Sequence, residues 1–220
     1  MATVAAYIDG FNLYYGMKAK YGRRYLWLDL VELVKRLRPG DDVVAVRYFT
    51  AVVKGEPAAA ANQINYIDAL AAHCGQVLDI RRGWFKTRTI APCMTCGDHW
   101  MCTCPRRYRS HEEKETDVAL GVAMVEDAAC RLADCTVLVS ADSDMAPAVA
   151  ALRRINPAHP VLVAMPPGNL QPHKRFTGVG HFSINETALR RSQLPVSVTD
   201  GSGTGVPPPC QVGVTAPATT

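Results

Sequence analysis

The sequence predicts an α/β fold in which helices cover a mostly parallel β-sheet in three layers. Three observations predict it. Apolar segments of strand character alternate with segments of helical periodicity from the N-terminus onward, which is typical of parallel sheets. The 220 residues are 48% hydrophobic, enough for one domain with a sizeable core. Acidic residues also follow two of the apolar segments, where the carboxyl ends of parallel strands form a ligand crevice.

The first half of the chain is predicted to alternate between strands and helices. Apolar periodicity and β-branched or aromatic content distinguish the two kinds of segment. Pro39–Gly40 ends one helix, and Gly75 lies just past the end of another. The expected strands are 4–8, 43–53 and 76–85, and the expected helices are 13–21, 29–37 and 56–74.

A central helix is expected over residues 112–132, after a segment, 87–110, that has no clean period. Its apolar stripe is formed by Val118, Val122, Val125 and Ala129, and Leu120 and Met124 broaden it. The remaining expected elements are strands at 135–139, 161–164 and 182–184, a helix at 146–155, and a small helix starting at Asn185.

One domain is expected over residues 1–190, with the cysteine-rich segment 87–110 as an insertion. Gly, Pro, Ser and Thr dominate from Pro195, so 195–220 is expected to be a flexible tail. No run of about 18 apolar residues is present, so no membrane span is expected. The N-terminus lacks the pattern of a signal peptide, which predicts a cytoplasmic protein.

The net charge of +4 is unevenly distributed. From Arg81 to Lys114 there are eight Lys/Arg and three Asp/Glu, a local charge of +5, so the rest of the chain carries about −1. A basic patch beside an acidic site would attract a phosphodiester substrate. A solvated, arginine-rich loop is the alternative.

Four of the eight cysteines are bunched within twelve residues, at Cys93, Cys96, Cys102 and Cys104. The first pair has the CxxC-Gly pattern of a zinc knuckle, and four thiolates would close a tetrahedral, structural site. The CxC half is less usual, so His99 or His111 is an alternative fourth ligand. A reduced, metal-free loop is the other interpretation.

Three stretches carry acids at the predicted crevice. Asp9 follows the first strand, Asp142 and Asp144 follow the strand 135–139, and Asp117 stands near the start of the central helix. Each has a simpler explanation: Asp9 as a turn residue, one of Asp142 and Asp144 as a helix cap, and Asp117 as a first-turn acid beside Glu112, Glu113 and Glu115.

Taken together, clustered carboxylates repel one another unless a cation joins them. Oxygen ligands suit Mg²⁺ or Mn²⁺. Such a site can polarise a phosphate and activate water for cleavage of a phosphodiester. No glycine-loop nucleotide motif or Ser-His-Asp order is present. The acids therefore predict a metal-dependent nuclease.

The blocks Ile8-Asp9-Gly10-Phe11-Asn12-Leu13, Glu113 to Leu120, and Val139-Ser140-Ala141-Asp142-Ser143-Asp144 resemble the signature blocks of NYN domains. These are relatives of PIN-domain nucleases, and the similarity is to the LabA-like (DUF88) branch. The resemblance, over roughly 4–184, implies a PIN-like, Rossmann-like fold and a divalent-metal ribonuclease. Carried over by motif, the acids and metal ligands are Asp9, Asp117, Asp142 and Asp144, with Asn12 and Ser140 orienting ligands or water and Lys114 beside the site.

The partner expected from this resemblance and the basic segment is RNA, most simply single-stranded, and a homodimer is left open. Alternatives are a nucleic-acid-binding or regulatory module without catalysis, in which Trp84, Phe85, Trp100 and Tyr108 stack on bases, and a protein adaptor that uses the zinc knuckle. The sequence does not distinguish RNA from DNA.

Overall fold

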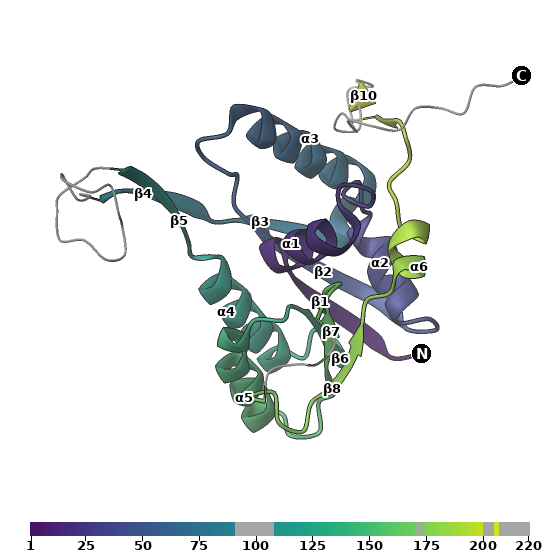
Figure 1. The fold of residues 1–220 in the computed structure, drawn as a ribbon. Helices are drawn as coiled ribbons and strands as arrows, with labels where there is room; N and C mark the ends of the chain where they lie inside the picture. Colours follow the sequence, from purple (N-terminus) through teal and green to yellow (C-terminus); the bar gives the residue numbers. More distant parts are fainter. Residues whose placement is uncertain (91–107, 170, 172–173, 200–204, 207–220) are drawn as a thin grey trace, which may run out of the picture.

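A computed structural model describes residues 1–90, 108–169, 171, 174–199 and 205–206 (Figure 1). Its centre is a six-stranded sheet in the order β3-β2-β1-β6-β7-β8, in which every pairing is parallel. This confirms the predicted α/β fold. The strands are β1 (Thr3–Asp9), β2 (Asp42–Thr50), β3 (Leu78–Arg82), β6 (Cys135–Val139), β7 (Val161–Met165) and β8 (Gly180–Ser183).

The strand order reverses its direction between β1 and β6. The chain first builds the sheet outward from β1 through β2 to β3, and later returns to the other side of β1 with β6, β7 and β8. Ile8 of β1 lies in register with Tyr48 of β2 and Val139 of β6. A crevice therefore opens beyond the carboxyl ends of β1 and β6, the position at which open α/β sheets bind ligands.

Helices cover both faces of the sheet. One face carries α1 (Gly10–Tyr21), α2 (Leu30–Leu37), α3 (Pro57–Cys74) and α6 (Glu186–Arg191), and the other carries α4 (Thr116–Ala129) and α5 (Ala146–Ile155). Successive residues of β1 point to opposite faces: Val4, Ala6 and Ile8 join the first core, and Ala5 and Tyr7 join the second.

Short polar side chains begin three of these helices. Asp29 accepts a hydrogen bond from the backbone N–H of Glu32 at 2.9 Å to cap α2, and Asn185 accepts one from Ala188 at 2.8 Å to cap α6. Asp9 caps α1. Such caps satisfy backbone donors that the helix leaves without an acceptor, and each contributes about 1 kcal/mol. The caps place the helix starts within a few residues of the predicted ones.

The expected strand 76–85 is divided in the structure. β3 ends at Arg82, and after Gly83 the strand β4 (Trp84–Ile90) leaves the sheet and pairs antiparallel with β5 (Tyr108–Lys114). A Cβ atom at Gly83 would lie 2.6 Å from the carbonyl oxygen of Lys114, so only glycine permits this close crossing. The β4–β5 hairpin projects from the body of the domain (Figure 1). The predicted zinc ligands lie between its strands, outside the described residues.

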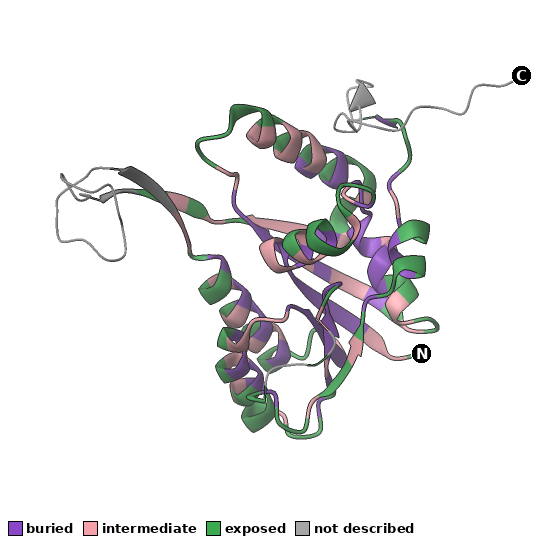
Figure 2. Cartoon of the chain, in the orientation of Figure 1, coloured by how far each residue is buried: buried purple, intermediate pink, exposed green. Residues whose placement is uncertain are grey.

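The hairpin also corrects the start of the central helix. Residues 112–114 pair with 84–86 in the hairpin, so α4 begins at Thr116 rather than at residue 112. The predicted apolar stripe is wrong in its centre, because Val118 is 71% exposed and Val122 is 58% exposed, whereas Leu120 and Met124, expected to broaden it, are buried. Figure 2 shows the exposed outer side of α4 and the buried side against the sheet. The buried residues of this helix are Thr116, Leu120, Ala123, Met124 and Ala128.

A polar network fastens α4 to the sheet. The hydroxyl of Tyr7 donates to Asp127 Oδ2 at 2.7 Å, and Arg47 Nη2 donates to Asp127 Oδ1 at 2.7 Å. The side chains of Arg47 and Asp127 are 18% and 13% exposed. A charge pair this far from solvent is stable only while both partners are present, so it fixes α4 relative to β1 and β2.

The last described residues continue the packing beyond α6. Val198 in β9 (Val198–Thr199) is 4% exposed and belongs to the core cluster on the α3 side. Val198 therefore anchors the start of the predicted tail to the domain, whereas Pro195, Val196, Ser197 and Thr199 are exposed. β9 pairs with β10 (Gly205–Val206).

Among the described helices, none combines the length and apolar content needed to cross a membrane.

Candidate functional site

Asp9 is held at the carboxyl end of β1 by partners from two elements. The backbone N–H of Asn12 donates to Asp9 Oδ1 at 2.9 Å, and the hydroxyl of Ser140 donates to Asp9 Oδ2 at 3.0 Å. Asp9 is 7% exposed and Ser140 is fully buried. The end of β1 and the end of β6 are thus joined through this carboxylate, which has one fixed orientation.

A second set of hydrogen bonds positions the loop after β6. Asn12 Oδ1 accepts from the N–H of Ala141 at 3.1 Å, and Ser140 Oγ accepts from the N–H of Asp142 at 3.0 Å. Asp142 Oδ1 in turn accepts from the N–H of Asp144 at 2.9 Å, capping a 3₁₀ turn. Asn12 and Ser140 therefore fix the positions of the acids and of the loop that carries them. Their expected role in orienting ligands or water stays a prediction.

Asp117 reaches the site from the opposite side, through a backbone turn at Glu115. Glu115 has φ of 80°, a left-handed conformation that is uncommon for a residue with a side chain. This turn sends the chain from β5 into α4. Asp117 is the acid in the first turn of α4, whereas Glu113, expected there as well, belongs to β5 and accepts from the N–H of Thr116 at 3.1 Å.

Asp9, Asp117 and Asp142 line one open cleft with a volume of about 450 Å³. The structure thus brings together three of the four predicted acids. Asp144 is exposed and lies outside this lining. Lys114 does not line the cleft either, because its ammonium group pairs with Glu112. The other lining residues are Phe11, Asn12, Tyr15, Val53, Lys54, Glu56, Phe85 and Glu113.

The cleft is electrostatically unfavourable for its own carboxylates. Burial raises the pKa of Asp9, and the charge of Asp142 raises it further, against hydrogen bonds from Asn12 and Ser140 that lower it. Partial desolvation raises the pKa of Asp117 to about 6, and the negative charges around it add to the shift. A pKa raised in this way marks a site where a cation would relieve the repulsion.

The donor set fits a hard divalent cation that keeps part of its water shell. Within the described residues, no three His, Cys, Asp or Glu side chains are already gathered at metal-binding distances. Mg²⁺ is commonly held by one or two carboxylates and several waters, so it does not require such a group. The buried, oriented carboxylate of Asp9, with Asp117 and Asp142 in the same open cleft, supplies the one or two carboxylate ligands that such an ion needs.

An aromatic wall stands beside the acids, and most of it was not predicted. Phe11 and Tyr15, four residues apart on α1, have ring centroids 6.3 Å apart with an interplanar angle of 20°. Phe85 of the hairpin meets Phe11 edge-on at 5.9 Å. The stacking role of Phe85 was one of the alternatives, but Phe11, Tyr15, Glu113 and Lys54 were missed. The i, i+4 spacing of aromatic residues directly after Asp9 was the available signal for two of them.

An acidic cleft at the reversal point of a parallel sheet is a feature of the PIN-like, nuclease-type class of α/β domains. The chain belongs to the NYN domain family, whose model matches residues 3–169. A curated relative, 6-hydroxy-3-succinoylpyridine 3-monooxygenase HspA of Pseudomonas putida, is 29% identical over 173 residues. That match covers 67% of this chain and 54% of the relative, so the chain spans about half of the relative's length.

A solved structure has the same general fold. It is the crystal structure of a protein of unknown function from Vibrio parahaemolyticus, with a TM-score of 0.50 and 17% sequence identity. The superposition covers 84% of this chain and 94% of the other. At this identity the likeness concerns the fold alone.

Proposed function

We propose that this protein is a ribonuclease that hydrolyses RNA phosphodiesters in the acidic cleft and depends on a divalent metal ion. The observation that carries the proposal is the convergence of Asp9, Asp117 and Asp142, from three separate segments of the chain, on one open cleft. Their mutual repulsion costs stability in the absence of a cation. A purely structural role would not require that cost.

Mg²⁺ or Mn²⁺ would be held by Asp9, Asp117 and Asp142, with Asp144 at the rim, and when bound would supply Lewis-acid activation of the phosphate and of water. The protein's own contribution is orientation. Ser140 and the N–H of Asn12 fix the two oxygens of Asp9. Preorganised groups of this kind do not have to rearrange during the reaction, which is how a rigid site lowers a barrier.

Single-stranded RNA is the substrate that best matches the walls of the cleft. The rings of Phe11, Tyr15 and Phe85 lie beside the acids, and aromatic side chains stack on unpaired bases with little regard to sequence. A duplex would keep its bases inside its own stack. The sequence carries an excess of positive charge over residues 81–114, and the described strands of this segment reach the cleft through Phe85 and Glu113, so we expect this charge to attract the phosphate backbone.

The proposal is tested by the Asp117→Asn variant with a labelled single-stranded RNA in Mn²⁺ or Mg²⁺. We expect the cleavage rate to fall at least about 100-fold, because the change removes a charged ligand of the metal ion that would activate the phosphate and the water. Glu126→Gln, on the exposed side of the same helix, is the matched control and should keep the parent rate. A parent rate in Asp117→Asn would refute the assignment. Single-stranded DNA of the same sequence, assayed alongside, measures the preference for RNA.

A second candidate is an RNA-binding or regulatory module that does not cut. It is favoured by the absence, among the described residues, of a ready-formed group of three metal ligands. RNA binding that survives replacement of the acids of the cleft, together with no cleavage by the parent protein in either metal, would select it.

The name of the Pseudomonas relative suggests a further assay. A monooxygenase acting on a hydroxypyridine requires dioxygen and a two-electron reductant. Incubation of the parent protein with 6-hydroxy-3-succinoylpyridine, air and a reduced nicotinamide would detect substrate loss. We expect none, because the acidic cleft is suited to a cation and a phosphate rather than to a redox group.

A further inference from the structure

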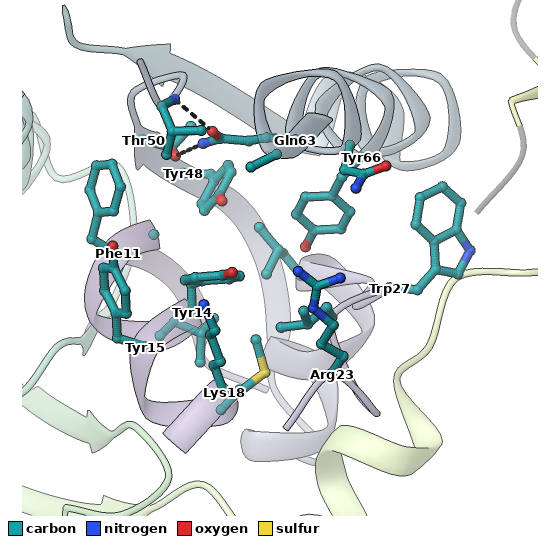
Figure 3. A pocket seen from close by; sticks show the side chains of 18 of the residues that line it. Phe11, Tyr14, Tyr15, Lys18, Arg23, Trp27, Tyr48, Thr50, Gln63 and Tyr66 are labelled. Atoms are coloured by element: carbon teal, nitrogen blue, oxygen red, sulfur yellow. Dashed lines mark hydrogen bonds between the residues drawn. The ribbon is translucent and has the colours of Figure 1, made fainter. Parts of the chain in front are cut away.

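A second cavity lies on the other side of the aromatic wall, between α1 and α3 over the end of β2 (Figure 3). Its volume is about 220 Å³. Tyr14, Tyr48, Tyr66 and Trp27 contribute rings to its lining, and Arg23 and Lys18 stand at its edge. Drug-sized ligands occupy cavities of about 300–1,000 Å³, so this cavity has the size of a single flat ring system.

The cavity and the acidic cleft are neighbours that share part of their walls. Phe11, Tyr15, Val53 and Glu56 line both spaces. A nucleic acid strand could therefore place a phosphate in the cleft and the base of a neighbouring nucleotide in the cavity at the same time. This shared wall distinguishes the cavity from an isolated packing defect between two helices.

Most of the polar groups in its wall are committed to the fold. Gln63 donates through Nε2 to Thr50 Oγ1 at 3.1 Å and accepts through Oε1 from the N–H of Val53 at 3.0 Å. The hydroxyl of Tyr66 donates to the carbonyl oxygen of Leu28 at 2.7 Å. These bonds hold the aromatic rings in place, so the cavity is built by the fold rather than left open by loose side chains.

Asn62 and Arg23 are two of the polar groups in the lining that are available to a ligand. Asn62 lines the cavity, is half-buried, and makes no side-chain hydrogen bond to any residue that the structure describes. Its amide offers a donor and an acceptor side by side, which matches the polar edge of a base. Arg23, exposed at the rim, extends toward the space between Tyr14 and Tyr66 in Figure 3, where it could meet a phosphate.

We propose that this cavity binds one unpaired nucleobase of the RNA whose phosphodiester lies in the acidic cleft. The inference rests on the proposed ribonuclease function and adds a base-recognition subsite to it. Stacking between tyrosine rings supplies affinity, and Asn62 supplies an edge contact that discriminates among bases. The cleavage position would then be set relative to the base that occupies the cavity.

The test fills the cavity without removing a core side chain. Ala59 lines the cavity and Ala61, on the same helix, is exposed and does not. Ala59→Leu is the blocking variant and Ala61→Leu is the matched control. Tyr14→Ala, which removes one half-buried ring, is a second variant in case leucine at position 59 impairs folding. The probes are the four nucleoside 5′-monophosphates, with nicotinate as an aromatic ring of a different class.

Binding is measured without metal, by quenching of intrinsic fluorescence, in the parent and in Asp117→Asn. We expect at least one nucleotide to bind about tenfold more weakly to Ala59→Leu and Tyr14→Ala than to the parent and Ala61→Leu, the scale of one lost stacking contact. Equal nucleotide binding by the parent and both cavity variants, or binding of nicotinate but of no nucleotide, would overturn the proposal.

An oligonucleotide series tests whether the cavity recognises a base within an RNA strand or only a free nucleotide. An abasic residue is moved stepwise past the cleaved bond. We expect one fixed position to raise KM about tenfold in the parent but not in Ala59→Leu, and the lack of any sensitive position would overturn the RNA subsite. Cleavage without nucleotide binding would refute the subsite alone. Nucleotide binding by a parent that cleaves nothing would support the base site and refute the ribonuclease.

Discussion

Neutralising Asp117 should stabilise the protein in the absence of metal, although it should abolish cleavage. The pKa of this carboxyl is raised from 3.8 to about 6 by desolvation and by the neighbouring acids. The first turn of a helix favours a negative charge by about 0.3–1 kcal/mol, so the opposing terms must be larger than that. The full shift corresponds to about 3 kcal/mol. Discounting for the solvent around an exposed carboxylate leaves about 1 kcal/mol for Asp117→Asn near neutral pH.

The sign and the pH window follow from linkage. Because the native pKa is the higher one, the folded state holds its proton more tightly, and stability is lost as pH rises from about 4 to about 6. Urea unfolding of metal-free protein should therefore show Asp117→Asn more stable than the parent at pH 7.5 and equal to it at pH 4. Added Mn²⁺ should stabilise the parent more than the variant. Glu126→Gln is the control, and a less stable Asp117→Asn at pH 7.5 would refute the reasoning.

Further predictions concern the backbone and the buried charges. Gly10→Ala should destabilise by about 1–3 kcal/mol in urea unfolding, because its Cβ would lie 2.6 Å from a backbone carbonyl oxygen of β2. Glu115→Gly should leave stability unchanged or raised by up to about 1 kcal/mol, since φ is 80° there, and Glu115→Val should lower it. Asp127→Ala should cost about 3 kcal/mol, because the largely buried Arg47 would keep only Asp79 as a charged partner, and the added change Arg47→Met should recover part of it. Cys96→Ser should lower the zinc content of purified protein measured by mass spectrometry, and unchanged content would exclude it as a ligand.

Most of the sheet could be predicted because its central strands β1, β6 and β7 are short, apolar and largely buried. The strand 135–139 and the helix 146–155 are found with the predicted bounds. The errors occur where the pattern is ambiguous. α4 is apolar on several sides. The predicted stripe was therefore centred on Val118 and Val122, whereas packing against the sheet and α5 selects the face of Leu120 and Met124, which were expected only to broaden it. Tertiary contacts, rather than periodicity, decide such a helix.

The candidate site was predictable to the extent that its acids follow strand ends. The positions of Asp9 and Asp142 follow from a parallel sheet alone. The position of Asp117 depends on the turn at Glu115, and no local pattern marks a left-handed conformation at a glutamate. Glu113 was assigned to a helix and lies in the hairpin, because the strand pairing that places it involves a partner about 30 residues earlier. The second cavity could not be predicted from the sequence, because it forms only when three separate elements, α1, β2 and α3, come together in space.

The hydrogen bond between Ser140 and Asp9 joins residues 131 positions apart. Contacts of such long sequence separation close late in folding, because the entropy of the intervening loop is lost before they form. β1 must therefore wait for β6 before its carboxylate is oriented, and α1 can dock against β2 earlier. Fragments that end before β6 would retain Asp9 and Asp117 but would lack the partner that aligns them. The appearance of the site during refolding should thus report completion of the sheet rather than collapse of the chain.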